Sequence, residues 1–409
     1  MNKIFNQNLP KGWRKVKLGE TGLDIESGGR PPGGTLTVFS GIPSIGAEHL
    51  RDDGGFDFSK VKYVPENYYR EAKRGKIKKG DILVVKDGAT IGKVSRVSRF
   101  FPFSEAMVNE HVFIIRTNPD LIDQKFFYYK LINHEGKETI KGSISGSAQG
   151  GLKKDFLDYW IIDLPPLDDQ KRIADILSAF DDKIELNNKI IKTLEQMAQE
   201  IFRKEFNNSE KLIVNNEKLK SEKLEVKNAE EIFIFEKGIE PGSKYYSEIK
   251  KDNYIPFYRV RDLDKTDRAD VYIPEKIANG KICIENDVLL SLDATVGRVK
   301  IGCNGAFSSG IRRVYSKDGF IKNSFIYFWL KTPYVQNTIL KHSSGTTILH
   351  AGQSIKYLKI PFNEEIIQEV QSKVDLMFVK ILQTLKENQK LAVLRDLLLP
   401  KLMSGEIRI

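Results

Sequence analysis

The sequence predicts an α+β protein built from two similar α/β domains, each followed by a long helix, with the two helices paired as an antiparallel coiled coil. Two observations lead to this prediction. The chain repeats the order of its segments once, which indicates a duplicated domain. A hydrophobic heptad pattern also occurs at the middle of the chain and again at its end, which is typical of long helices packed along a narrow stripe. Such a molecule has approximate twofold symmetry.

The duplication is visible in segments that recur in the same order. The segment "GDILVVKDGATIGKV" (80–94) returns as "NDVLLSLDATVGRV" (286–299), and "FFYYKL" (126–131) returns as "FIYFWL" (325–330). Apolar runs such as "DILVV" and "DVLLSL" predict strands, whereas "FFYYKLIN" predicts a helix packed on the sheet. The order of the strands within each sheet does not follow from these patterns.

These patterns divide the chain into four parts. We place the first domain at 1–165, the central helix at 166–208, the second domain at 209–362, and the C-terminal helix with its tail at 363–409. Pro165 and Pro166 precede the central helix, and a proline pair of this kind typically marks a helix boundary. At 1.5 Å per residue, about 40 residues form a rod of roughly 60 Å.

Both helices carry a seam of residues spaced alternately by three and four. In the central helix the seam consists of Ile173, Leu177, Phe180, Ile184, Asn187, Ile191, Leu194, Ala198 and Ile201. In the C-terminal helix it consists of Ile367, Val370, Val374, Met377, Ile381, Thr384, Asn388, Leu391 and Leu398, with Pro400 as the expected stop. Each seam contains one asparagine, and a polar residue at such a position can fix the register of a coiled coil. An antiparallel pair is therefore expected to place Asn187 near Asn388. Two unpaired amphipathic helices remain the alternative.

Charge and composition favour a polyanionic partner and exclude several classes of protein. The net charge of +10 divides into +6 for residues 1–165, −2 for 166–206, +6 for 207–362 and 0 for the remainder. Two basic domains separated by near-neutral helices suit nucleic acid, although many soluble domains carry a similar charge. No apolar run reaches the ~20 residues of a membrane helix, and two cysteines are too few for a disulfide framework. A cytoplasmic location is expected.

The sequence contains no recognisable catalytic or metal-binding motif. The segment "GATIGKV" (88–94) has three residues between its glycines where a phosphate-binding loop has four, and Val94 stands where that loop carries Ser or Thr. The five histidines show no spacing typical of a metal site. "PDLIDQK" (119–125) contains nuclease-like residues, but they are compressed into one helix start. The chain is therefore expected to have no catalytic residues and no metal of its own.

Several segments together resemble a known family. They are "GWRKVKLGE" near the start, the paired segments at 80–94 and 286–299, "LPPLDDQKRIADILSAFDDKIELNN" (164–188) and the closing "LLPKLMSGEIRI". Over its whole length the chain resembles the specificity subunit of type I restriction-modification systems. One departure is that "IPFNEEIIQEV" (360–370) lacks the Pro-Pro-x-x-x-Gln pattern found at 165–170.

The resemblance implies a non-catalytic subunit with two target-recognition domains, each reading one half of a split sequence in double-stranded DNA. It also implies that the paired helices dock two methyltransferase subunits, which methylate adenine, and that restriction subunits can join the complex. The cofactors S-adenosylmethionine, ATP and magnesium are expected on those partners, and none on this chain. The DNA sequence recognised cannot be predicted.

Polar residues in the glycine- and serine-rich loops are the candidates for DNA contact, because Lys and Arg bind phosphates while Arg, Gln and hydroxyl groups reach base edges. In the first domain they are Arg30, Lys86, Thr90, Lys93, Lys141, Ser143, Ser145, Ser147, Gln149 and Lys153. In the second domain they are Lys244, Asp293, Thr295, Arg298, His342, Ser344, Thr346, Thr347, His350 and Gln353.

Two other functions remain open at this point. A coiled-coil scaffold whose twin domains bind proteins would expose aromatic residues in its loops, whereas these loops are mostly Gly, Ser, Thr and Lys. A stand-alone nuclease or methyltransferase is disfavoured because its motifs are missing.

Overall fold

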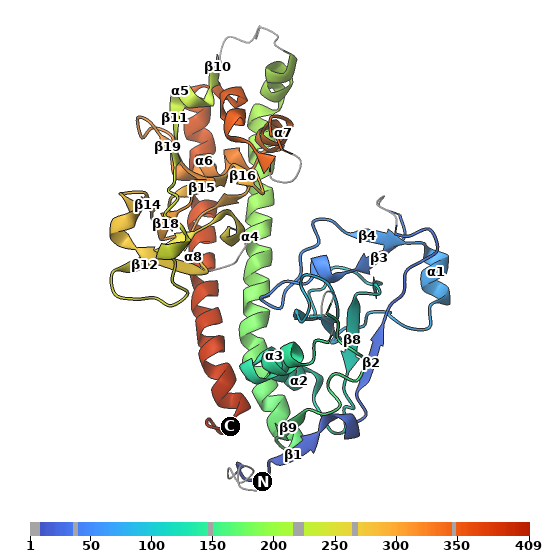
Figure 1. The fold of residues 1–409 in the computed structure, drawn as a ribbon. Helices are drawn as coiled ribbons and strands as arrows, with labels where there is room; N and C mark the ends of the chain where they lie inside the picture. The colour runs from blue at the N-terminus through green and yellow to red at the C-terminus, as the bar shows by residue number, and fades with distance from the viewer. Residues whose placement is uncertain (1–8, 36–39, 146–149, 216–224, 264–268, 346–348) are drawn as a thin grey trace. The chain divides into compact units, whose positions relative to one another are not determined.

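The computed structural model describes residues 9–35, 40–145, 150–215, 225–263, 269–345 and 349–409, with backbone only for 207–215. The chain forms two compact units. The first unit comprises Met1–Glu185 and Leu391–Ile409, and the second comprises Leu186–Lys390. Each unit contains one mixed domain and one stretch of each of the long helices α4 (Leu167–Asn215) and α8 (Glu364–Met403) (Figure 1).

The domain of the first unit contains three small sheets. Their strand orders are β2-β8-β5-β6, β4-β3-β7 and β1-β9. The strands are β1 (Arg14–Lys17), β2 (Asp24–Ser27), β3 (Ile42–Ile45), β4 (Lys62–Val64), β5 (Ile82–Val85), β6 (Val94–Arg96), β7 (Met107–Val108), β8 (Val112–Arg116) and β9 (Ile161–Leu164). The helices are α1 (Glu66–Glu71), α2 (Gln124–Ile132) and α3 (His134–Gly142).

The domain of the second unit has the same plan. Its sheets follow the orders β11-β19-β15-β17, β13-β12-β18-β14, β10-β21 and β16-β20. The strands are β10 (Glu225–Asn228), β11 (Phe233–Lys237), β12 (Tyr254–Tyr258), β13 (Val271–Pro274), β14 (Ile282–Cys283), β15 (Val288–Ser291), β16 (Asp293–Ala294), β17 (Val299–Lys300), β18 (Gly305–Phe307), β19 (Ile311–Ser316), β20 (Leu349–His350) and β21 (Lys359–Phe362). The helices are α5 (Ala229–Ile232), α6 (Asn323–Leu330) and α7 (Pro333–Lys341).

The two domains therefore repeat one topology, as the sequence predicts. The main sheet of each domain has the central strand β8 or β19 between two antiparallel neighbours. In each smaller sheet the second strand of the order, β3 or β12, makes one antiparallel and one parallel pairing. Strand pairing is strictly specified where one face of a sheet is buried, because a one-residue slip would move every apolar side chain of a strand to the opposite face. Agreement between the two domains in strand order and in pairing direction therefore indicates a true duplication.

The predicted helices "FFYYKLIN" and "FIYFWL" form α2 and α6, and both are almost completely buried. Phe126 and Phe127 of α2 lie in a core with residues of α4 and of the α8 end, whereas Phe325 and Phe328 of α6 lie in a core with other parts of the same two helices. Each domain is thus fused to its stretch of helix by one continuous hydrophobic core. At roughly 25 cal/mol per Å² of apolar surface, such burial is the main stabilising contribution.

A buried glutamine attaches each domain helix to a long helix. Gln170 Oε1 accepts a hydrogen bond from the Asp123 backbone N–H at 2.8 Å, just before α2. Gln371 Oε1 accepts one from the Lys322 N–H at 2.6 Å, just before α6. Gln371 stands further into α8 than Gln170 does into α4, outside any Pro-Pro-x-x-x-Gln pattern. The second half therefore keeps the glutamine contact although it lacks the sequence pattern.

The long helices pair antiparallel in the second unit. Asn187 Nδ2 donates to Asn388 Oδ1 at 2.8 Å, and both side chains are buried. Further along α4, Glu205 pairs with Lys373 at 2.9 Å. Partner numbers on α8 fall as those on α4 rise, which defines the antiparallel direction. The two seam asparagines meet at the register that the heptad spacing predicts.

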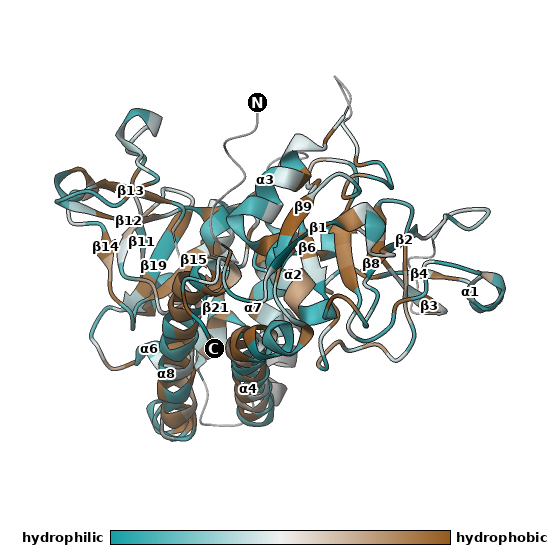
Figure 2. Ribbon diagram, turned by 90° about the horizontal axis from the view of Figure 1, so that it is seen from below, coloured by the Kyte–Doolittle hydropathy of each residue, from teal (hydrophilic) through white to brown (hydrophobic). Residues whose placement is uncertain are grey.

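The same two helices also meet within the first unit. Arg395 of α8 forms an ion pair with Asp181 of α4 at 2.6 Å, and Tyr129 of α2 donates to the other oxygen of that carboxylate at 2.5 Å. Ile173 and Leu177 of the α4 seam are buried in the core of this unit. Both α4 and α8 carry hydrophobic as well as hydrophilic segments along their length (Figure 2), as amphipathic helices do.

Both long helices extend beyond the ends expected from the sequence. α4 continues past 208 to Asn215, because the residues that follow include no Gly or Pro to stop it. Pro400 was expected to end α8, but it lies inside the helix, which continues to Met403. Pro400 lacks the N–H that would bond the carbonyl of Asp396, and only the last turn of the helix follows it. The stop is supplied by Gly405, whose positive φ of 72° is typical of a residue just past a helix end. Within the described residues, no helix is long and apolar enough to cross a membrane.

Candidate nucleic-acid interface

In the first domain two chain segments come together to form one polar surface. The Leu152 N–H donates to Lys86 O at 2.7 Å, and Asp87 forms a β-bridge with Gly151. These contacts join the turn between β5 and β6 to the loop that follows α3. We call residues 86–93, 143–145 and 150–153 the first loop surface. Gly92, with a positive φ of 86°, turns the chain back into β6.

The second domain builds the same arrangement from the repeated segments. The Ala351 N–H donates to Leu292 O at 2.7 Å, and β16 pairs with β20 so that Asp293 faces His350 across the two strands. The turn between β15 and β17 is thereby joined to the loop that follows α7. Residues 292–298, 343–345 and 349–353 form the second loop surface. Gly297 has a positive φ of 84°, which matches the role of its counterpart Gly92.

The sequence candidates divide into several groups in the structure. Residues in or beside the two loop surfaces are Lys86, Thr90, Lys93, Ser143, Ser145, Lys153, Asp293, Thr295, Arg298, His342, Ser344, His350 and Gln353. Arg30 lies in the loop after β2 and Lys244 in a short 3-10 turn, Ser243–Tyr245, and both are exposed. Lys141 ends α3. Ser147, Gln149, Thr346 and Thr347 lie outside the described residues.

Some candidates hold the loop surfaces in shape. Lys93 Nζ donates to Leu50 O at 3.4 Å and lies 3.5 Å from Asp52. Its counterpart Arg298 donates from Nη1 to Val260 O at 3.2 Å. In both domains, therefore, the basic residue of the turn is tied to the backbone of a neighbouring loop. This attachment fixes the position of the turn.

Two other candidates, one in each domain, follow the helices α3 and α7 and each makes a specific contact. The Ser143 hydroxyl donates to Thr139 O at 2.8 Å, which completes the end of α3. His342 stacks on Tyr357 with 3.8 Å between ring centroids. Lys153, Thr295, Ser344 and Gln353 are exposed at the two loop surfaces.

The structure adds two polar residues that the sequence candidates omit. Asp87 and His111 lie together at the first loop surface, with 2.5 Å between Asp87 Oδ1 and His111 Nδ1. Asp87 is the counterpart of Asp293 in the repeated segment, so the duplication could have identified it. No sequence signal indicates His111, because it follows Glu110 in a segment that is not rich in the glycine and serine typical of the candidate loops.

Arginine–carboxylate clusters stabilise each main sheet next to these surfaces. Arg116 contacts Asp81 at 2.6 Å and Glu26 at 2.8 Å. In the second domain Arg313 contacts Glu236 at 2.7 Å and Asp287 at 3.4 Å. The hydrogen bond with Asp81 is the largest cause that raises the pKa of Arg116. Both arginines are already paired with carboxylates of their own sheet, so they contribute little to a DNA-binding surface.

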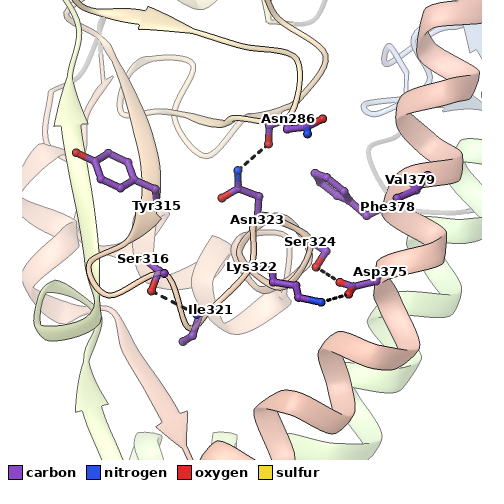
Figure 3. Close-up of a pocket in the computed structure, with 11 residues that line it drawn as sticks. Asn286, Tyr315, Ser316, Ile321, Lys322, Asn323, Ser324, Asp375, Phe378 and Val379 are labelled. Atoms are coloured by element: carbon purple, nitrogen blue, oxygen red, sulfur yellow. Dashed lines mark hydrogen bonds and ion pairs between the residues drawn. The ribbon is translucent and has the colours of Figure 1, made fainter.

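A separate cavity of about 490 Å³ lies in the second unit, where α6 begins beside α8 (Figure 3). Lys322 Nζ and Ser324 Oγ both contact the Asp375 carboxylate at 2.5 Å. Phe378 and Val379 supply an apolar wall from α8. The contacts with Asp375 attach the domain to the helix, and Leu376 on the same helix is exposed. Among the described residues, no group of three or more His, Cys, Asp or Glu could hold a metal ion.

Comparison with known proteins identifies the family. Residues 10–196 and 221–391 match the family model for the type I restriction modification DNA specificity domain. The chain belongs to this family. The two matched ranges correspond to the two repeats, so this specificity subunit carries two target-recognition domains and is the non-catalytic component of its restriction-modification system.

Relatives of similar length support the assignment. The chain is 27% identical to the type I restriction enzyme MjaIX specificity subunit of Methanocaldococcus jannaschii, over 98% of this chain and 95% of that protein. It is 25% identical to the HindI specificity subunit of Haemophilus influenzae, over 86% and 90%. The crystal structure of the type I restriction-modification system S subunit from M. genitalium has a similar fold, with a TM-score of 0.53, 19% identity and 97% coverage of both chains. A protein-binding scaffold is not favoured by these similarities.

Proposed function

We propose that this specificity subunit recognises a bipartite target in double-stranded DNA, with one domain reading each half-site. The observation that carries the proposal is the repetition of the loop surface, which each domain builds from the same segments of the duplicated sequence. Two equivalent reading surfaces suit two half-sites. One turn of duplex separates half-sites by roughly 34–36 Å, and a 49-residue helix is about 74 Å long. The spacer helices are therefore long enough to span such a separation.

In the proposed complex this chain determines which DNA sequence is bound, and the partner subunits catalyse the reactions. Two methyltransferase subunits would dock on the long helices and methylate adenine with S-adenosylmethionine, and restriction subunits would add steps that need ATP and magnesium. This chain would bind none of these cofactors. The complex would act in the cytoplasm, where DNA is accessible.

Exposed apolar residues on α8 support a docking role for the spacer. In the second unit Leu376 and Val379 of α8 are 79% and 47% exposed, and Val379 lines the cavity of Figure 3. In the first unit Leu397 is 59% exposed on the same helix. Residues three positions apart on a helix, such as Leu376 and Val379, are neighbours on its surface, and a further partner could cover both.

A domain exchange tests half-site reading. Residues 1–165 are replaced by the first domain of another family member, and the methylated sequences are mapped in cells that also express the methyltransferase. One half of the recognised sequence should change while the other half and the spacing stay the same. If both halves change, independent reading by the two domains is wrong.

A separate exchange tests docking. Leu376→Lys places a charge on the exposed apolar face of α8, and Leu340→Lys is a matched control on α7, where Leu340 is 53% exposed. We expect Leu376→Lys to weaken co-purification with the methyltransferase and Leu340→Lys to leave it unchanged. Equal behaviour of the two variants would refute docking at this face.

A further inference from the structure

An aspartate–histidine pair stands at each loop surface. Asp87 Oδ1 lies 2.5 Å from His111 Nδ1 in the first domain, and Asp293 Oδ1 lies 2.8 Å from His350 Nδ1 in the second. The histidine side chains are 49% and 62% exposed. In both pairs the carboxylate approaches Nδ1, so Nε2 is the ring nitrogen left to meet a ligand.

The aspartates are equivalent in the repeat, but the histidines are not. His111 directly precedes β8, and the residue that directly precedes the equivalent strand β19 is Gly310. His350 bridges Asp293 from β20, and the residue that bridges Asp87 in the first domain is Gly151. Each domain therefore has histidine at one of two positions around the aspartate and glycine at the other.

Local packing explains why the histidine comes from a different segment in the second domain. A Cβ at Gly310 would lie 2.9 Å from the Val260 side chain and 3.1 Å from Asp293 Cβ, so position 310 has no room for a ring. The second domain nevertheless has the same pair, with the ring supplied from the other side. A histidine thus meets the equivalent aspartate in both domains, from the segment just before β8 in the first and from β20 in the second. The pair is kept although the segment that supplies the ring differs.

The chemistry of the pair defines what its free nitrogen can recognise. An ionised carboxylate only accepts hydrogen bonds, so in the neutral ring Nδ1 carries the proton and Nε2 presents a lone pair. In the major groove the donors available to such an acceptor are the exocyclic amino groups of adenine (N6) and cytosine (N4). Guanine and thymine present acceptors at the corresponding positions.

At the first pair, nearby carboxylates favour a base amino group over a phosphate. Glu110 Oε1 lies 3.6 Å from His111 Nε2, longer than a hydrogen bond, and it adds a second acceptor to the first pair. Asp87 and Glu110 together make that position unfavourable for a phosphate. In the second domain the partly buried Arg312 interacts electrostatically with Asp293, and its Nη1 donates to Ser309 O at 2.6 Å.

We propose, on the basis of the DNA-recognition function above, that each aspartate–histidine pair reads one exocyclic amino group in its half-site. His111 and His350 would be the specificity-determining residues, and Asp87 and Asp293 the positioning residues that fix the tautomer. Reading of a base amino group would differ from general attraction to the phosphate backbone, which carries no sequence information.

The test uses the subunit assembled with its methyltransferase and duplexes that carry its mapped target. Each adenine is replaced in turn by purine and each cytosine by 2-pyrimidinone, which removes one exocyclic amino group at a time. Binding is measured at pH 8 for the wild type, His111→Ala and His350→Ala. His134→Ala is the matched control, because His134 is an exposed histidine at the start of α3.

For the wild type we expect one position in each half-site where loss of the amino group weakens binding about 3- to 10-fold, the size of one hydrogen bond. His111→Ala should remove that sensitivity in one half-site only, and His350→Ala in the other only, while His134→Ala keeps both. If both alanine variants keep the wild-type sensitivities, the inference is wrong although DNA recognition stands. If the wild-type complex binds no DNA, the proposed function itself fails.

Discussion

The asparagine pair at the centre of the spacer allows a quantitative test of the coiled coil. Asn187 and Asn388 are 1% and 0% exposed. Asn187 Nδ2 donates to Asn388 Oδ1 and to Glu387 Oε2, both at 2.8 Å, and Asn388 Nδ2 donates to Asn188 Oδ1 at 2.9 Å. Asn187→Ala removes two of these hydrogen bonds and leaves the Asn388 amide oxygen buried without its donor. An unsatisfied buried polar group costs about 1–3 kcal/mol, and a lost bond to a charged group adds more, so we expect a loss of about 2–4 kcal/mol.

Urea unfolding followed by circular dichroism measures this loss. Gln196→Ala, at an exposed position of the same helix, should change the free energy of unfolding by less than about 0.5 kcal/mol. The double variant Asn187→Leu with Asn388→Leu should recover most of the stability, because both partners become apolar, while register is less strictly specified. If Asn187→Ala is no less stable than Gln196→Ala, the buried pair does not contribute as described.

Four further outcomes are expected. Glutamate at Leu177 and at Ile191 together should abolish assembly with the methyltransferase, measured by gel filtration, and normal assembly would contradict the role of the seam. Arg116→Leu leaves the buried Asp81 carboxylate without its cation and should destabilise the first domain by about 3–5 kcal/mol, whereas Arg99→Leu at an exposed position should cost far less. Burial raises the pKa of the Cys303 thiol to about 11, against about 8.5 in an unfolded chain. Because the folded state holds this proton more tightly, the free energy of unfolding should be unaffected below about pH 8.5 and should fall between about pH 8.5 and 11. A Cys303→Ala variant should lose less stability over that range. Target binding should weaken steeply with salt. When the salt concentration rises tenfold, the logarithm of the association constant should fall by about 0.9 for each phosphate contact. A flat response would count against DNA as the ligand.

The overall architecture could be predicted because its signals are periodic and repeated. The heptad seams predicted both helices, and the single asparagine in each seam predicted their register, which the hydrogen bond between Asn187 and Asn388 matches. The strand order could not be predicted, because β5 lies between β6 and the distant β8 and nothing local specifies that neighbour. The expected stop at Pro400 is wrong, because α8 continues to Met403, and Gly405 just past it has the positive φ typical of a helix end.

The interface was predicted only in outline. Glycine- and serine-rich composition located the loops, but composition does not reveal which side chains are already engaged. Lys93 and Arg298 remain candidates for DNA contact, and the structure shows that each also donates to a neighbouring backbone carbonyl. The pair formed by Asp87 and His111 was missed because its members are 24 residues apart and meet only through the antiparallel pairing of β5 and β8.

Genome-wide mapping of methylated adenine, in a host that expresses this subunit with its methyltransferase, tests the account most directly. Two short specific sequences separated by a fixed number of unspecified base pairs are expected, and they should disappear when the subunit is omitted. A single uninterrupted recognition sequence, or methylation that does not depend on the subunit, would contradict reading by two separate domains.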